Sequence, residues 1–372
     1  MMNAREVLQK FHEVAASPKA MKDRYLAEGR KVILTAPVYT PEEIIHSFGF
    51  VPMGAWGADV AINEAKRYFP AFICSIMQSI LELGMNGAYE GVSAIVIPSL
   101  CDSLKVLGQN WKYAVKDIPF IPMTYPQNRK PSYGKTFVLA GYERVIKDLE
   151  AATGASFDEA ALGESIKVYN KHNALMRKFA ELAATYGQIT VADRNAVYKS
   201  ATFMRKEEHS VLLEELFQVL EAEAPQEGKT KVMVSGILMD APGFIDIFDE
   251  NELQIAWDDV AAWSRQYATD ACECCPPLES LAGKFVKMDN CSVLYDPSKN
   301  RVHKIVEDAK AYNAKGVILV LTKFCDPEEF DNPLIKKACN EAGLPCIVVE
   351  IDRQMTNYEQ ARTMIETFRE ML

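Results

Sequence analysis

The sequence has a shortage of basic residues and no long apolar run. Its 41 Lys and Arg are outnumbered by 51 Asp and Glu, which gives a formal net charge of −10. Nucleic-acid and anionic-membrane binding need a surplus of Lys and Arg, so this balance argues against both partners. No stretch reaches the roughly 20 apolar residues of a transmembrane helix, and residues 1–8 lack the apolar core of a signal peptide. We therefore expect a cytoplasmic protein.

Three common catalytic signatures are also missing. The five histidines are scattered and form no HExxH pair, and no GxGxxG follows a strand-like run. Gly134-Lys135-Thr136 looks like the end of a P-loop, but Arg129 stands where that loop needs its first glycine. Zinc-protease chemistry, dinucleotide binding through this fingerprint and P-loop ATP hydrolysis are therefore not predicted.

The length of 372 residues suggests more than one domain. Strand-like and helix-like runs alternate from Lys31 to about Pro126 and again from Lys231 onward, which predicts two parallel sheets. The stretch between them has helical spacing and almost no strand signal. We expect an α/β fold with two Rossmann-like parallel-sheet domains joined by a helical segment. The expected limits are 1–130 (first α/β domain with an N-terminal helix), 131–225 (helical segment) and 226–372 (second α/β domain).

Two of the nine cysteines directly follow predicted strands. Cys101 comes after the apolar run 93–100, Cys325 comes after the run 316–324, and each is followed by Asp. Ligands bind beyond the carboxyl ends of parallel strands, so the two sheets should place both thiols in one shared cleft. The segment 326–329, Asp-Pro-Glu-Glu, is typical of a helix start with Asp as its N-cap. A helix N-terminus lowers the pKa of a nearby thiol and favours the thiolate that ligates iron or zinc.

A third cysteine, Cys74, lies at the predicted first turn of another helix. In a cytoplasmic protein, clustered cysteines indicate metal or redox chemistry more often than disulfides. With Cys101 and Cys325, Cys74 would supply ligands from three distant segments, unlike the paired hairpins of structural zinc sites. From spacing alone, ligation of a cluster and three inert core thiols are equally good interpretations.

Cys272, Cys274 and Cys275 form the densest group of cysteines in the chain. Adjacent cysteines do not easily ligate one ion together, but this group could cap a metal site or supply a fourth cluster ligand. A reactive or fortuitous loop explains it equally well.

Two basic residues lie near predicted strand ends. Arg265 and its neighbour Ser264 follow the strand 254–257, where a guanidinium and a hydroxyl could bind an anionic group, and a solvated helix start is the alternative. Lys323 lies two residues before Cys325, so strand alternation would place its ammonium near a cluster. A solvated lysine at the strand end is the alternative there.

The chain resembles the β-type subunits of 2-hydroxyacyl-CoA dehydratases, such as the (R)-2-hydroxyglutaryl-CoA and 2-hydroxyisocaproyl-CoA enzymes. The resemblance runs over nearly the whole length. Its most specific parts are Phe72-Ile73-Cys74-Ser75, Pro98-Ser99-Leu100-Cys101-Asp102-Ser103-Leu104-Lys105, Ser235-Gly236, the surroundings of Ser264-Arg265, and Lys323-Phe324-Cys325-Asp326-Pro327-Glu328-Glu329. Benzoyl-CoA reductase subunits belong to the same wider group.

The resemblance implies a 4Fe-4S cluster held by Cys74, Cys101 and Cys325, and it assigns no catalytic residue. It also implies a homologous α subunit that carries a second cluster and binds the acyl-CoA, and an ATP-dependent iron-sulfur activator that injects one electron. A flavin in the complex is compatible with it.

The implied activity is that of a hydro-lyase in amino acid fermentation. Water leaves an (R)-2-hydroxyacyl-CoA by a ketyl-radical mechanism to give an enoyl-CoA, and the cluster of the β subunit relays or stores the injected electron. Two alternatives are a subunit of a related aryl- or acyl-CoA reductase and a non-catalytic metal-binding scaffold. The acyl chain and the fourth cluster ligand stay open.

Overall fold

A computed structural model of the chain describes residues 3–372 and contains two four-stranded sheets. The first consists of β1 (Val32–Thr35), β2 (Val51–Gly54), β3 (Ala94–Pro98) and β4 (Phe120–Met123), in the order β2-β1-β3-β4. The second consists of β5 (Thr230–Gly236), β6 (Leu253–Val260), β7 (Gly316–Thr322) and β8 (Cys346–Ile351), in the order β6-β5-β7-β8. All neighbouring strands are parallel. The predicted α/β class with two Rossmann-like parallel sheets is confirmed.

Helices cover both sheets, and the strands are accordingly apolar. Every residue of β1, β2 and β3 is buried, as a parallel sheet covered on both faces requires. The first sheet carries α2 (Pro18–Ala27), α3 (Glu42–Ser47), α5 (Asp102–Ala114) and α6 (Ser132–Thr153), and α4 (Ser75–Met85) packs against α5. The second carries α10 (Pro242–Glu250), α12 (Asn300–Ala311), α13 (Asp326–Glu341) and α14 (Glu359–Met371).

The two sheets share one connectivity. In each, the chain passes from the central strand (β1 or β5) to one neighbour and then crosses to the other side, to β3 or β7. The point where the direction of winding reverses opens a crevice beyond the carboxyl ends of the strands. β3 and β7 therefore occupy equivalent positions, and the repeated order of strand, Cys, Asp and helix reflects this shared plan.

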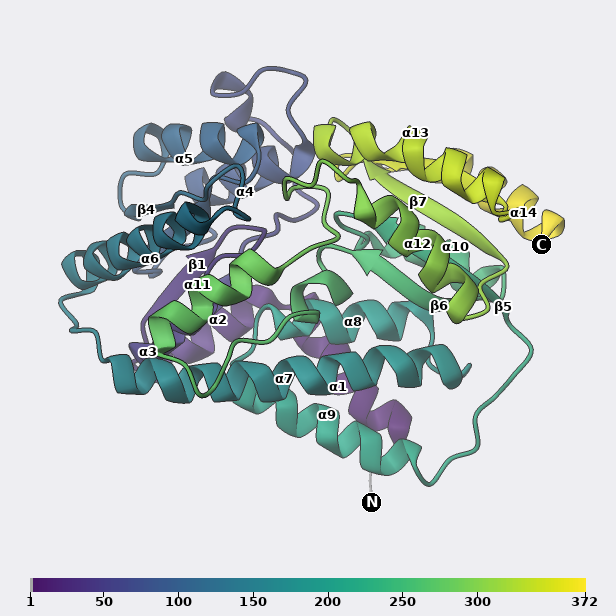
Figure 1. Cartoon of the computed structure of the whole chain (residues 1–372), viewed down its shortest axis with the longest axis horizontal. Helices are drawn as coiled ribbons and strands as arrows, with labels where there is room; N and C mark the ends of the chain where they lie inside the picture. Colours follow the sequence, from purple (N-terminus) through teal and green to yellow (C-terminus); the bar gives the residue numbers. More distant parts are fainter. Residues whose placement is uncertain (1–2) are drawn as a thin grey trace.

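A layer of helices joins the two sheets. Figure 1 shows α7 (Glu159–Thr185), α8 (Val191–Ala201) and α9 (Lys206–Leu220) running beneath both sheets, with α1 (Ala4–Ala16) packed against α8 and α9. α7 contacts α3 on the first side and β6 on the second. One apolar core runs through both halves and this layer. The domain limits at 130 and 225 stay a prediction. No helix in the described part of the chain is both long and apolar enough to span a membrane.

Two fully buried histidines connect α7 with α9. Nε2 of His172 lies 3.0 Å from Nδ1 of His209, whose Nε2 lies 3.0 Å from the carbonyl oxygen of Val197. A carbonyl only accepts, so the proton of His209 is on Nε2, and its Nδ1 accepts from His172. Both rings are therefore neutral. Burial lowers the pKa of both histidines, to about 3 for His209.

We expect the folded chain to lose stability as the pH falls below about 6.5, the ordinary pKa of histidine. In that range the unfolded chain protonates both histidines while the fold keeps them neutral, so unfolding takes up protons. Each histidine then contributes up to about 1.4 kcal/mol per pH unit. Urea unfolding between pH 7 and 5 measures the slope. His209→Gln should reduce it and His303→Gln, at an exposed position, should not. Equal slopes in all three proteins would contradict the assignment.

Candidate metal centre

Three cysteines from distant parts of the sequence line one cavity. Cys74, Cys101 and Cys325 are the N-cap residues of α4, α5 and α13, respectively. All three border a cavity of about 540 Å³. In Figure 1, α4, α5 and the beginning of α13 meet at the junction of the two halves. The structure thus brings together the three residues that the sequence singled out.

The cavity lies where the switch points of both sheets face each other. Its walls include Pro37 and Val38, which follow β1, and Ile237, which follows β5. The loops after β3 and β7 contribute Cys101 and Cys325. Open parallel sheets bind ligands at this position, and here each sheet contributes one thiol to the same space.

The turn that presents Cys325 differs from the expected one. β7 ends at Thr322, Phe324 has a positive φ of 62°, and the amide of Cys325 donates to the carbonyl of Thr322 at 2.9 Å. The helix begins at Asp326, so Cys325 and not Asp326 is the N-cap. Strand alternation does not extend to Lys323, whose Nζ lies 5.3 Å from the centre of the Phe324 ring. Lys323 does not line the cavity, although Phe324 does, so the place of its ammonium beside a cluster stays a prediction.

The expectation of acidic thiols at the helix starts is also wrong for the metal-free chain. Burial raises the pKa of all three thiols, to about 12 for Cys101. The backbone amides of the first helical turns lower these pKa values by less. The charge of Cys74 further raises the pKa of Cys101 and Cys325, which reflects their proximity. A bound cation would therefore have to supply the charge that stabilises three thiolates here.

The spacing of the three thiols bears on what they can hold. Among residues 3–372, only Cys272, Cys274 and Cys275 bring three potential ligand atoms within 4.8 Å of one another. The cavity thiols are therefore spaced more widely than the ligands of a single ion. Cysteine sulfurs around a 4Fe-4S cluster lie about 6–7 Å apart. Three thiols at the edge of a 540 Å³ cavity leave room for a group larger than one zinc ion.

A buried ionic network lies behind Cys325, and nothing in the sequence pointed to it. Glu328, in the first turn of α13, accepts from Nη2 of Arg301 at 2.7 Å and from Nη2 of Arg265 at 3.1 Å. Arg301 also binds Asp259 at 2.8 Å and Asp331 at 2.9 Å. Burial alone would raise the pKa of Glu328, but the two arginines lower it to about 2. The network ties β6 and α12 to the first turn of the helix that Cys325 caps.

Arg265 has no free donor for an anionic ligand. The structure buries it, and its Nε donates to Asp259 at 2.7 Å. Its remaining donors face Glu328, Cys291 and Ser292. The hydroxyl of Ser264 donates to the carbonyl of Asp258 at 2.7 Å. Both side chains are thus engaged within the fold, and both also border a cavity of about 280 Å³. The interpretation of this pair as an anion-binding edge stays a prediction.

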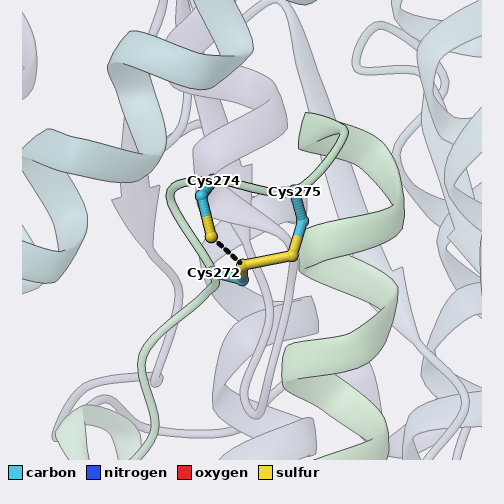
Figure 2. A group of neighbouring side chains, drawn as sticks. All are labelled: Cys272, Cys274 and Cys275. Carbon is cyan, nitrogen blue, oxygen red and sulfur yellow. Dashed lines mark hydrogen bonds between the residues drawn. A yellow bond between two sulfur atoms is a disulfide. The ribbon is translucent and has the colours of Figure 1, made fainter.

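The cysteines at 272, 274 and 275 lie elsewhere. They precede α11 (Pro277–Lys287), and none of them lines the cavity. Figure 2 shows their three sulfurs facing one another, with a disulfide between Cys272 and Cys275. The structure does not bring this group to Cys74, Cys101 and Cys325, so it does not support a fourth cluster ligand from here.

Comparison with known proteins places the chain in a family. Residues 37–372 match the family described as 2-hydroxyglutaryl-CoA dehydratase, D-component. The chain is 43% identical to the (R)-phenyllactyl-CoA dehydratase beta subunit of Clostridium sporogenes, over the whole of both chains. It is 38% identical to the lactoyl-CoA dehydratase subunit beta of Anaerotignum propionicum, again over the whole of both.

A third relative is the (R)-2-hydroxyglutaryl-CoA dehydratase subunit beta of Acidaminococcus fermentans, with 39% identity over 98% of this chain and 99% of that one. All three relatives are named as β subunits of dehydratases, which are hydro-lyases. The predicted resemblance and enzyme class are confirmed. The chain belongs to the 2-hydroxyglutaryl-CoA dehydratase D-component family, that of the β subunits of 2-hydroxyacyl-CoA dehydratases.

Proposed function

We propose that this chain is the β subunit of an iron-sulfur 2-hydroxyacyl-CoA dehydratase and that Cys74, Cys101 and Cys325 hold a 4Fe-4S cluster. One observation carries the proposal: three helix N-caps, drawn from both sheets, surround a single cavity. The donors are all sulfur, the usual ligand of iron-sulfur clusters. The three sulfurs do not all lie within 4.8 Å of one another, as the ligands of a single ion would.

A cluster would supply one-electron chemistry that no side chain provides, so that a thioester carbonyl is reduced to a ketyl radical able to expel the 2-hydroxide. The residues of this chain would hold and insulate it. Three helix N-termini favour the negative charge that accumulates on a reduced cluster. The pairing of Glu328 with Arg301 fixes the first turn of α13 and with it the position of Cys325.

The proposed complex contains more than this chain. The relatives are named beta subunits, which supports an α-type partner that carries the second cluster and binds the acyl-CoA. The lack of a P-loop in this sequence supports a separate ATP-dependent activator that injects the electron. A cytoplasmic location and a flavin in the complex stay predictions. If the chain were a subunit of an acyl-CoA reductase, the acyl group would be reduced. If it were a non-catalytic metal-binding scaffold, there would be no turnover.

We expect turnover only when the chain is combined with its partner. The chain alone, supplied with a chemical one-electron reductant, should leave (R)-phenyllactyl-, lactoyl- and (R)-2-hydroxyglutaryl-CoA unchanged, because the proposed acyl-CoA site lies on the α subunit. Anaerobic assays with an α-type subunit, the activator and ATP should yield an enoyl-CoA from one of the three. Mass spectrometry of the acyl-CoA products checks both the chain alone and the complete complex. Dehydration by the chain alone would overturn the proposed division of labour, and no product from the iron-loaded complex would overturn the function.

A further inference from the structure

The loop before α11 gathers three sulfurs at an exposed position. The Sγ atoms of Cys272, Cys274 and Cys275 all lie within 4.8 Å of one another, and those of Cys272 and Cys274 are 3.3 Å apart. Cys274 and Cys275 are exposed and Cys272 is half-buried. The loop turns all three sulfurs toward one another (Figure 2), and those of Cys272 and Cys275 form a disulfide.

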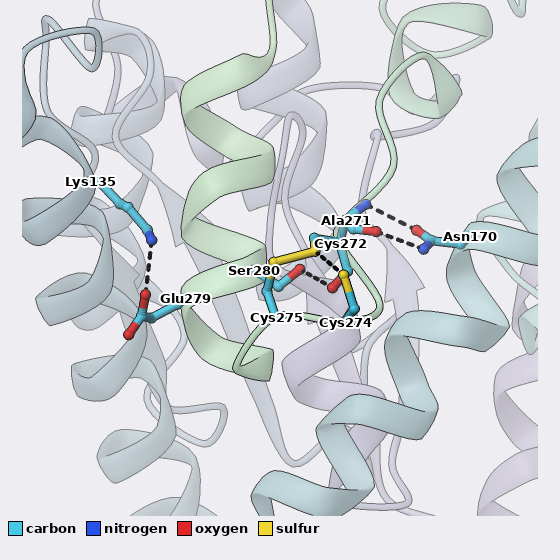
Figure 3. The surroundings of a disulfide bond; sticks show 8 residues. All are labelled: Lys135, Asn170, Ala271, Cys272, Cys274, Cys275, Glu279 and Ser280. Atoms are coloured by element: carbon cyan, nitrogen blue, oxygen red, sulfur yellow. Dashed lines mark hydrogen bonds and ion pairs between the residues drawn. A yellow bond between two sulfur atoms is a disulfide. The ribbon is translucent and has the colours of Figure 1, made fainter.

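Neighbouring helices hold this loop in place from two sides. Asn170 of α7 donates to the carbonyl of Ala271 at 2.8 Å and accepts from the amide of Ala271 at 3.0 Å. Ser280 of α11 donates to the carbonyl of Cys272 at 2.7 Å. Figure 3 shows both anchors beside the sulfurs. A ligand set whose backbone is already fixed loses little conformational entropy when an ion binds.

We propose that Cys272, Cys274 and Cys275 form a second metal site that takes one thiophilic ion of the Zn²⁺ class and is separate from the cavity. Thiolate sulfurs select soft and borderline ions over Mg²⁺ or Ca²⁺. Zinc–sulfur bonds of about 2.3 Å place the sulfurs of one ion roughly 3.8–4.0 Å apart. The sulfurs of Cys272 and Cys275 are bonded to each other here, so they must move apart on reduction to reach this spacing. All three sulfurs lie within 4.8 Å of one another, which is too close to surround a 4Fe-4S cluster.

The proposed site has an open fourth position. No His, Asp, Glu or fourth Cys in the described chain joins the three sulfurs within the same 4.8 Å. The carboxylate of Glu273 accepts from Asn170 at 2.9 Å instead. An ion held by three thiolates keeps one position for water or an external ligand, unlike the closed four-ligand sites of structural zinc.

The ion can bind only when the Cys272–Cys275 disulfide is reduced. A phosphine reductant breaks this sulfur–sulfur bond with one water molecule, which gives two thiols and the phosphine oxide. Together with the thiol of Cys274 the loop then has three thiols. Binding of Zn²⁺ displaces their protons to solvent, so the apparent affinity should rise with pH.

Crossed variants test the second site. The wild-type chain is loaded with iron and sulfide anaerobically, reduced with the phosphine and titrated with Zn²⁺ against a chromophoric chelator. A loop variant (C272S/C274S/C275S) and a cavity variant (C74A/C101A/C325A) are treated alike, and Cys346→Ser serves as the matched control. Wild type, control and cavity variant should each bind one Zn²⁺ per chain, and the loop variant should bind at least on the order of 100-fold more weakly.

Iron analysis and alkylation separate this proposal from the proposed function. The loop variant should keep its iron, so loss of zinc and loss of iron are independent outcomes. In wild type, Zn²⁺ should slow alkylation of the peptide that contains residues 272–275, measured by mass spectrometry. Equal zinc affinity of the loop variant and wild type would overturn the second site. Alkylation of the loop at the same rate with and without Zn²⁺ would overturn it as well.

Discussion

Replacement of Cys325 by alanine should abolish iron binding in the cavity. Among residues 3–372, Cys74, Cys101 and Cys325 are the only cysteines that line this cavity. Removal of any one leaves two thiols, which cannot hold a cubane against loss to solvent. After anaerobic reconstitution, wild type should contain about four iron atoms per chain. Cys74→Ala, Cys101→Ala and Cys325→Ala should each contain less than about one. Iron and sulfide analysis, together with the visible absorption of the cluster, measures the loss.

Two controls make the loss specific. Cys346→Ala removes a cysteine that does not line the cavity, and C272S/C274S/C275S removes the loop group. Both should bind as much iron as wild type, and their unfolding midpoints should match it. Full iron occupancy in Cys325→Ala, or loss of iron in the loop variant, would show that the cluster is held elsewhere.

Arg301→Met should cause a large loss of stability. Arg301 is 3% exposed and pairs with Asp259, Glu328 and Asp331. Its removal leaves Asp259 and Glu328 with Arg265 as their remaining partner and Asp331 with Lys299. Breaking buried pairs in this way costs about 3–5 kcal/mol. Urea unfolding of the variant and wild type at pH 7 measures the difference. Iron content should fall too, because Glu328 lies in the first turn of α13 behind Cys325.

Two further variants show whether the loss of stability comes from the buried network. Arg301→Lys keeps the charge but loses the forked donors, so it should fold and lose less stability than Arg301→Met. Lys171→Met removes one partner of the exposed Lys171–Glu214 pair, 2.8 Å apart, and should change stability by no more than about 1 kcal/mol. If Arg301→Met unfolds with the same free energy as Lys171→Met, the network does not stabilise the fold as argued.

Local patterns in the sequence were enough to place two of the three cavity cysteines. A parallel strand is a short apolar run, a helix start follows it, and ligands bind where the two meet. Cys101 and Cys325 carry this pattern, and they lie at equivalent positions of two sheets with the same strand order. Cys74 has no preceding strand, so only its helix start and the family resemblance indicated it.

Features that depend on tertiary packing could not be predicted in the same way. Asp259, Arg301 and Glu328 are far apart in the sequence, and each alone is an ordinary charged residue. The thiol pKa values rise because burial outweighs the helix N-termini, and the extent of burial is not a local property. The alternation argument for Lys323 does not apply, because the strand ends at Thr322 and Phe324 turns the backbone, which interrupts the period of two.

The position of iron within the folded chain tests the central claim most directly. Crystals of the reconstituted chain, grown without oxygen, can be measured on either side of the iron absorption edge, and the anomalous difference map then shows the iron atoms alone. We predict one compact group of peaks in the cavity, with iron about 2.3 Å from the sulfurs of Cys74, Cys101 and Cys325. Iron bound at Cys272, Cys274 and Cys275, or a group of peaks that any of the three cavity thiols does not contact, would contradict the account.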